Sequence, residues 1–397
     1  MTRPHTCTYN EKSGGYTITM KQDVSNGQGY TLTANHDEVK EIVFDSSRGS
    51  QSRTLTVEGE HTAETISLAN AGTNSINVTE GSKLVAGQMS GSGKLIKTGA
   101  GSLEIQGGST AYNLEIRGGD VLSNGTLGEV TMSNGGSLVM NQGSATAKSL
   151  TVGNGCTAEV QHVFGNKAFE TATVAEGGTL KGSGKFGNTI LQKGSTLVVD
   201  NSPGLQSYQG ALEVHEAKLV YSIDDALSWR NYAKEGASGW NSGTYSTINM
   251  NSQSLTLDNP EFTFALGENI LERLALQTYG TRELTDVLGK ELSTELDLVL
   301  IAGVNTMADP YKVFEGYTSY GQKTVFQLSD DDATLVAKGL TADITTQNLQ
   351  YYIDGNDLCM KTVLHVTLAA APDVPEPTTV TLSLLALAGL MARRRRK

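Results

Sequence analysis

The chain has 397 residues, of which 45 are glycine, 18 % are charged and 38 % are hydrophobic. The glycines follow no three-residue period, which excludes a collagen-like rod, and the apolar share is large enough for a buried core, which excludes wholesale disorder. The formal net charge of −12 would repel phosphate backbones, so we expect no nucleic-acid partner.

Short apolar pairs recur along residues 30–199, about ten residues apart, between threonine, serine, asparagine and glycine. Leu55 with Val57 and Leu103 with Ile105 are examples. Alternation of this kind indicates a half-buried strand, and the glycine and asparagine pairs between the strands indicate tight turns. The pattern predicts many short strands, in an N-terminal part over residues 1–83 and a glycine-rich part over residues 84–204.

Near copies of one segment favour a solenoid over a sandwich. They are SLEIQGG at 102–108, NLEIRGG at 113–119 and SLTVGNG at 149–155. Such internal repeats are typical of stacked equivalent coils, in which each strand pairs with the coil above. We therefore expect an all-β fold built on a right-handed parallel β-helix, with two pattern steps in each coil of about 22 residues.

Two glycine-rich stretches carry a resemblance. GSGKLIKTGAGSLEI at 91–105 and GNTILQKGSTLVVDNSPG at 187–204 resemble the passenger-associated repeats of autotransporter-type surface proteins. The resemblance implies a surface β-solenoid without implying a particular ligand. Autotransporters also carry a C-terminal translocator of alternating strands, and this chain ends differently, so we do not expect self-translocation.

The composition changes after residue 204. Residues 205–371 contain both tryptophans, and the spacing of Leu271, Leu274, Leu284 and Val287 predicts a helix near 268–295. Residues 296–301, 324–328 and 358–368 are predicted strands. We expect a β-rich domain that caps the open end of the solenoid, where unpaired strand edges invite aggregation.

Motifs for cofactors and metals lack the context that they need. GSGKFG at 182–187 matches a dinucleotide fingerprint, but a short strand follows it where a helix is required. The six histidines show no ligand spacing, and Cys7, Cys156 and Cys359 lie far apart. The aspartate runs at 224–225 and 330–332 lack the alternation of a calcium loop. We expect no cofactor and no metal.

An enzyme is the minority interpretation. Parallel β-helices can carry polysaccharide-degrading sites, and Glu104 and Glu115 would suit one if they stacked on adjacent strands. Tyr112 is the one aromatic residue between 84 and 163, which leaves little for a sugar ring to stack on. We therefore assign no catalytic residue.

The last residues, 372–397, form the most specific segment. Residues 378–392 are uncharged and mostly apolar, and as a helix they would rise about 22 Å, a marginal span for a bilayer. A proline-rich triplet precedes them and a cationic cluster follows them, which would hold the far end on the cytoplasmic side. The triplet is Pro375, Glu376 and Pro377, and the cluster is Arg393, Arg394, Arg395, Arg396 and Lys397.

This order resembles the PEP-CTERM sorting signal of Gram-negative bacteria. The resemblance implies export, transient insertion of the segment as a C-terminal transmembrane sorting helix in the inner membrane, recognition by an exosortase-type enzyme, and delivery to the cell surface or extracellular matrix. A permanent membrane anchor is the alternative. Residues 1–30 contain no apolar region of the length that a secretory signal needs, so we expect the sequence as given to lack its true start.

Together these features predict an exported β-solenoid with a structural or adhesive role, facing glycans or its own copies. A β-helix enzyme and an autotransporter-like adhesin stay as alternatives. Fractionation of cells with an antibody to the body would show whether the protein is exported and where its mature C-terminus ends.

Overall fold

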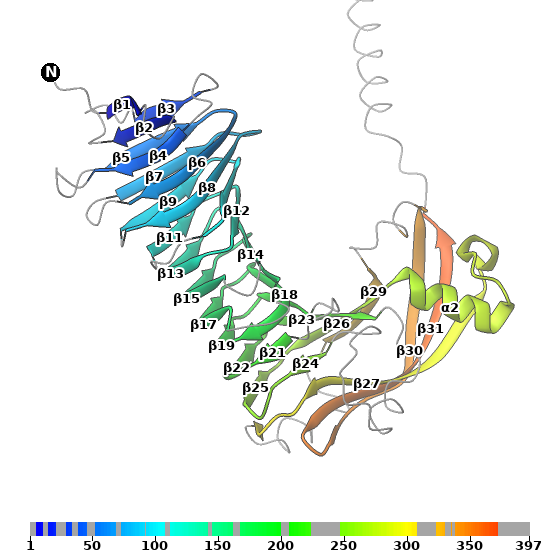
Figure 1. Ribbon diagram of the computed structural model, residues 1–397. Helices are drawn as coiled ribbons and strands as arrows, with labels where there is room; N and C mark the ends of the chain where they lie inside the picture. Colours follow the sequence, from blue (N-terminus) through cyan, green and yellow to red (C-terminus); the bar gives the residue numbers. More distant parts are fainter. Residues whose placement is uncertain are drawn as a thin grey trace, which may run out of the picture.

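A computed structural model gives the fold. It describes residues 5–10, 15–20, 29–33, 39–45, 52–68, 73–91, 93–107, 112–141, 145–161, 167–199, 206–223, 247–307, 323–329, 335 and 338–371. Within these ranges nearly all regular structure is β-strand, which confirms the all-β class (Figure 1).

Sheet 1 is built from strands that recur along the chain and alternate with the strands of a second sheet. Each strand pairs in parallel with the strand two or three places further along. Its members are β2 (Gly15–Met20), β4 (Val39–Phe44), β6 (Glu60–Ser67), β8 (Lys83–Ser90), β10 (Ser102–Ile105), β12 (Asp120–Ser123), β14 (Ser137–Asn141), β16 (Thr157–Gln161), β18 (Thr179–Phe186), β20 (Thr196–Val199), β23 (Lys218–Ile223), β26 (Glu261–Leu266) and β29 (Lys323–Leu328). β1 (His5–Asn10) adds an antiparallel strand to β2.

Sheet 2 is made from the intervening strands, again all in parallel. Its members are β3 (Tyr30–Leu32), β5 (Arg53–Val57), β7 (Thr73–Val78), β9 (Lys94–Thr98), β11 (Tyr112–Ile116), β13 (Thr126–Met132), β15 (Thr146–Val152), β17 (Phe169–Val174), β19 (Asn188–Leu191), β22 (Leu212–His215), β25 (Ser254–Asp258) and β28 (Thr306–Met307). We call one strand of sheet 1 with the next strand of sheet 2 a coil.

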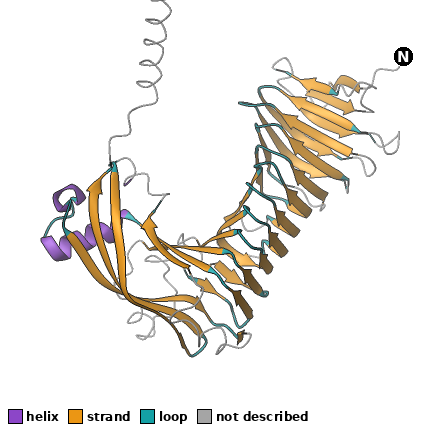
Figure 2. Cartoon of the chain, turned by 180° about the vertical axis from the view of Figure 1, so that it is seen from behind, coloured by secondary structure: helices purple, strands orange, loops and turns teal. Residues whose placement is uncertain are grey.

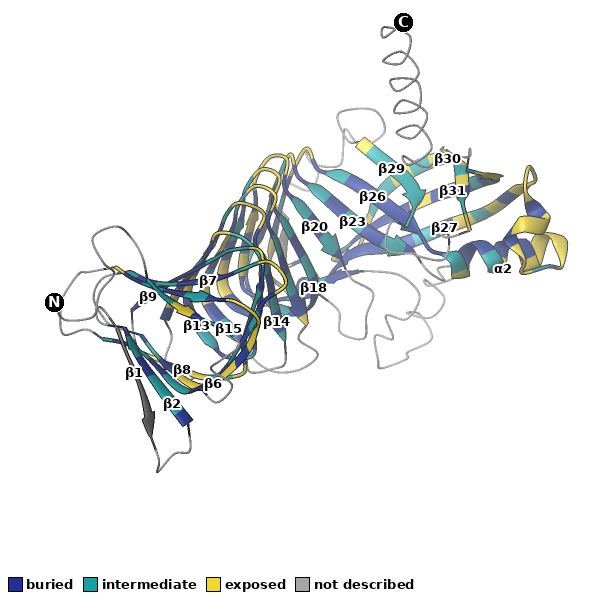
Figure 3. Cartoon of the chain, turned by 90° about the horizontal axis from the view of Figure 1, so that it is seen from above, coloured by how far each residue is buried: buried dark blue, intermediate teal, exposed yellow. Residues whose placement is uncertain are grey.

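Apolar side chains at alternate positions fill the space between the two sheets. In β10, for example, Leu103 and Ile105 are fully buried while Ser102 and Glu104 are partly exposed. Figure 3 shows the same alternation of buried and more exposed residues along the strands. Because lateral neighbours are in register, Leu103 pairs with Val121 and Val121 with Leu138, so each inward row forms a continuous apolar stack.

The number of residues from one coil to the next lies on both sides of the expected value of about 22. Leu114 pairs with Val130, 16 residues on, whereas Tyr30 pairs with Leu55, 25 residues on. The parallel ladder also continues past residue 204, because Leu197 pairs with Leu219 and Leu219 with Phe262. Strand pairing in sheet 1 therefore continues on both sides of residue 205.

Sheet 3 departs from sheet 1 at the end of β18. It runs through β21 (Gln206–Tyr208), β24 (Ile248–Asn249) and β27 (Glu291–Ala302) in parallel. Two long antiparallel strands, β31 (Asp357–Ala370) and β30 (Leu340–Asp354), complete it. Figure 2 shows these strands standing at an angle to the stack of coils. Helix α2 (Glu268–Tyr279) and the 3-10 helix η1 (Leu284–Val287) precede β27.

The expected helix over 268–295 is too long. α2 ends at Gly280, which has the left-handed φ of 76° that favours glycine at a helix end. From Glu291 the chain is extended because it pairs with β31. The predicted strands at 296–301, 324–328 and 358–368 lie within β27, β29 and β31 and are confirmed.

The near copies at 102–108 and 113–119 are not stacked on each other. The first lies in β10 of sheet 1, and the second lies in β11 of sheet 2. The two segments look alike because both strands of a coil share one alternation of buried and more exposed residues.

Gly182 explains the literal match to a dinucleotide fingerprint. It lies inside β18 with a φ of 105°, and a Cβ atom there would stand 2.1 Å from the carbonyl oxygen of Val160 on β16. Glycine is therefore needed for the close stacking of two coils.

Several expectations fall outside the described residues: the sorting segment 372–397, both tryptophans and the aspartate runs at 224–225 and 330–332. Within the described ranges, none of the helices has the length and apolar character needed to span a bilayer.

Candidate functional site

Charged side chains on the outer faces pair from coil to coil. The ammonium group of Lys83 lies 2.8 Å from the carboxylate of Glu104, and that of Lys181 lies 3.0 Å from Glu159. Further pairs of this kind join Lys40 with Glu64, Lys193 with Glu216, and Lys218 and Lys323 with the shared Glu261. Each pair links neighbouring coils, so the charges reinforce the stacking register.

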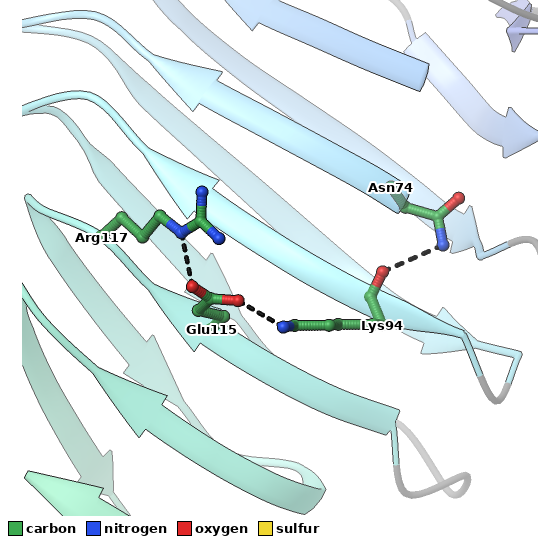
Figure 4. Close-up of polar contacts among 4 residues, drawn as sticks. All are labelled: Asn74, Lys94, Glu115 and Arg117. Carbon is green, nitrogen blue, oxygen red and sulfur yellow. Dashed lines mark hydrogen bonds and ion pairs between the residues drawn. The ribbon is translucent and has the colours of Figure 1, made fainter. Parts of the chain in front are cut away.

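Figure 4 shows the densest group, on three successive strands of sheet 2. Glu115 on β11 accepts from Lys94 on β9 and from Arg117, just beyond the end of β11. Above them the side-chain amide of Asn74 on β7 donates to the carbonyl oxygen of Lys94 at 3.1 Å. Glu115 is the least exposed member of the ion-paired trio. The group therefore anchors three coils to one another.

These contacts hold the carboxylates in the ionised form. The hydrogen bond from Arg117, aided by Lys94, keeps the pKa of Glu115 below its usual range. The hydrogen bond from Lys83 does the same for the pKa of Glu104. For Glu159, burial acts to raise the pKa, but the hydrogen bonds from Gln161 and Lys181 outweigh it and the pKa is lowered. A general acid needs the opposite shift.

Glu104 and Glu115 do not stack on adjacent strands, which was the condition for a catalytic pair. Glu104 is in β10, where its lateral neighbours are Val85 and Leu122. Glu115 is in β11, where its neighbours are Ile96 and Thr131. The two carboxylates point outward from different sheets, so the structure does not bring them together as a pair.

Two buried cations were not anticipated from the sequence. Arg53 and Lys97 are fully buried at inward positions of β5 and β9. The ammonium of Lys97 donates to the carbonyl oxygens of Thr98, Gly99 and Gly118 at 2.9, 2.9 and 3.2 Å. Burial lowers the pKa of Lys97 to about 8. The sequence does contain a signal for Lys97. It lies two residues after the apolar Leu95 on the same strand, and alternate residues of a strand face the same side.

Metal-binding groups are sparse in the described part of the chain, where no cluster of three or more suitable side chains is found. His215 is partly exposed, and its two ring nitrogens lie 3.5 Å from a carboxylate oxygen of Glu213 and 3.6 Å from one of Asp258. Cys156 and Cys359 are buried thiols without a disulfide.

The residues that the sequence marks for sorting follow the end of sheet 3. β31 ends at Ala370, and its last residue pairs with Leu340 at the start of β30. Pro375, Glu376, Pro377 and the cluster Arg393 to Lys397 lie beyond the described residues, so their arrangement is not part of the site geometry.

A comparison with protein families assigns this segment. Residues 373–397 are a PEP-CTERM protein-sorting motif. The PEP-CTERM motif marks an exported protein that an exosortase-type enzyme sorts to the cell envelope or surface. No curated protein and no solved structure matches the chain. The assignment thus concerns the end of the chain, and the role of the body is argued from its geometry.

Proposed function

We propose that the body is a right-handed parallel β-solenoid that the cell exports as a structural or adhesive rod. The observation that carries this proposal is the coil-by-coil parallel register of sheets 1 and 2, with apolar rows inside and cross-coil ion pairs outside. Such an array is extended, and each coil contacts chiefly its neighbours. Its long outer faces are suited to contact with extended partners and not to enclosing a small molecule.

The outer face of sheet 1 supports a role in binding extended polar partners. Ser137, Thr157, Thr179 and Thr196 follow one another in register on β14, β16, β18 and β20, and all four are partly exposed. Rows of hydroxyl groups that repeat about every 4.8 Å can donate and accept along a glycan chain or a second copy of the rod. The resemblance of residues 91–105 and 187–204 to autotransporter repeats points in the same direction.

A catalytic role has less support. Glu104, Glu115 and Glu159 are held ionised by lysine, arginine or glutamine partners, and the first two face away from different sheets. We therefore propose that the chain is not an enzyme and that these carboxylates stabilise the stack.

We further propose that the exosortase removes the PEP-CTERM segment and that the body reaches the surface or extracellular matrix of a Gram-negative bacterium. The test is cell fractionation with an antibody to the body, followed by mass spectrometry of the mature C-terminus. A surface form that ends before Thr378 supports removal, and a surface form that retains Lys397 contradicts it. A double variant, Pro375→Ala with Pro377→Ala, should accumulate unprocessed, whereas Pro372→Ala, just outside the motif, should be processed normally.

A further inference from the structure

A group of exposed apolar side chains lies near the end of β31. Among the described residues, five large apolar side chains are exposed: Leu276, Tyr279, Leu288, Ile190 and Ile353. The first three, at 39, 42 and 36 % exposure, belong to α2 and to the turn after η1. We call Leu276, Tyr279 and Leu288, together with Lys290, the α2–η1 corner.

The corner is held in a fixed arrangement. Ile270, Leu271 and Leu274 are buried and attach α2 to the core, while Leu276 and Tyr279 remain exposed. The phenol of Tyr279 donates to the carbonyl oxygen of Glu291 at 2.9 Å. The ammonium of Lys290 lies 5.1 Å from the centroid of the Tyr279 ring. An aromatic ring with a polar tip beside a long cationic side chain is the combination found at bilayer interfaces.

The corner also lies beside the point where the sorting segment leaves the sheet. The amide of Gly289, next to Leu288, donates to the carbonyl oxygen of Leu368 at 2.8 Å, and Glu291 pairs with Thr367. Figures 1 and 2 both show α2 beside the upper part of β31 and away from the coils. Thr378 follows Ala371 by seven residues, so the apolar segment starts within about 25 Å of the sheet.

We propose that the α2–η1 corner rests on the headgroup region of the bilayer that holds the sorting segment. The inference rests on the proposed function only in requiring that segment to enter a membrane. A second, weak contact beside the first adds to the attachment of the body, because stable anchoring to a membrane generally takes two signals.

The charges near the corner indicate which lipids it needs. The cations Arg282 and Lys290 lie in the same stretch as the acids Glu283, Asp286 and Glu291, so the corner carries no excess of positive charge. The contact is therefore interfacial and apolar, and it should change little when anionic lipid is replaced by zwitterionic lipid. A surface that bound chiefly through charge would respond strongly.

The test places spin labels on the full-length chain reconstituted in vesicles of phosphatidylethanolamine and phosphatidylglycerol. Labels are attached at Leu288→Cys and Leu276→Cys in the corner, at Ile190→Cys on sheet 2 as an exposed apolar control, and at Leu385→Cys in the sorting segment. All variants also carry Cys7→Ser, and circular dichroism verifies their folding. Collision rates with oxygen and with a water-soluble nickel chelate report whether each label contacts lipid or water.

We expect the oxygen-to-nickel ratio at both corner positions to exceed that at Ile190→Cys several-fold, with and without phosphatidylglycerol. A water-like ratio at both corner positions, while Leu385→Cys reports lipid, overturns the inference and leaves the sorting proposal standing. A water-like ratio at Leu385→Cys overturns the anchoring itself. A corner signal that needs phosphatidylglycerol contradicts the apolar contact.

Discussion

The ammonium nitrogen of Lys97 lies 2.8 Å from the point where a Cβ atom on Gly119 would stand. The same Cβ atom would come within 2.4 Å of the carbonyl oxygens of Gly99 and Gly101. The missing side chain of Gly119 thus makes room for two backbone carbonyl groups and one buried cation. Lys97 and Gly119 belong to neighbouring coils, so the contact is a property of the stack.

Gly119→Ala should therefore destabilise the protein more than a glycine substitution in open space. Gly119 and Gly81 have φ values of 66° and 71°, but a Cβ atom on Gly81 would meet nothing within 4 Å. Gly81→Ala should lower the free energy of unfolding by about 1 kcal/mol through backbone strain. Gly119→Ala should add a further ~1–3 kcal/mol of steric cost. Urea denaturation measures both, and equal losses would show that the close approach has no energetic role.

Lys97 should make stability depend on pH in the alkaline range. Its pKa is about 8 in the folded protein against 10.5 when unfolded, so between these values the unfolded chain binds more protons. The free energy of unfolding contributed by this group therefore rises with pH across that window. Lys97→Met should remove the rise. The measurement is urea denaturation of both proteins at several pH values, and parallel curves from pH 8 to 10.5 would contradict a neutralising buried lysine.

Glu115 should stabilise the stack at neutral pH and not in acid. Its lowered pKa means that the stabilisation is present above the unfolded value of 4.5 and is lost as the pH falls through the folded value. Glu115→Gln should cost about 1 kcal/mol at neutral pH and almost nothing in acid. Glu129→Gln, at an exposed position of the same sheet, is the matched control. If the two variants lose the same amount, the contacts with Lys94 and Arg117 contribute nothing.

The positions of the strands could be predicted from the sequence, but which strands pair with one another could not. Leu103 and Ile105 alternate with polar residues, which is enough to predict a strand. The same alternation at Leu114 and Ile116 makes the two segments look like stacked copies, although they lie in opposite sheets. Sequence similarity reports the local environment of a strand, which is the same on both sides of a coil. Pairing depends on the length of the turns, and these vary from coil to coil.

Local sequence patterns also gave the wrong secondary structure where tertiary contacts determine the conformation of the chain. Leu284 and Val287 have helical spacing, yet they form one 3-10 turn, and the chain from Glu291 is a strand because β31 offers it a partner. Lys97 is fully buried two residues after the buried Leu95, a position that alternation along the strand places inward. The sorting segment was predictable because its order of Pro375 to Pro377, apolar run and Arg393 to Lys397 is read as a linear signal.

The stacked coils are tested most directly by engineered cross-links in the full-length chain. Thr151 and Thr173 are lateral partners on β15 and β17, and parallel neighbours about 4.8 Å apart can be joined by a disulfide. Under mild oxidation, the double variant Thr151→Cys with Thr173→Cys should form an intramolecular disulfide, detected by mass spectrometry of its peptides. Glu104→Cys with Glu115→Cys, on different sheets, should stay reduced. A disulfide in the second pair and none in the first would contradict the parallel stack.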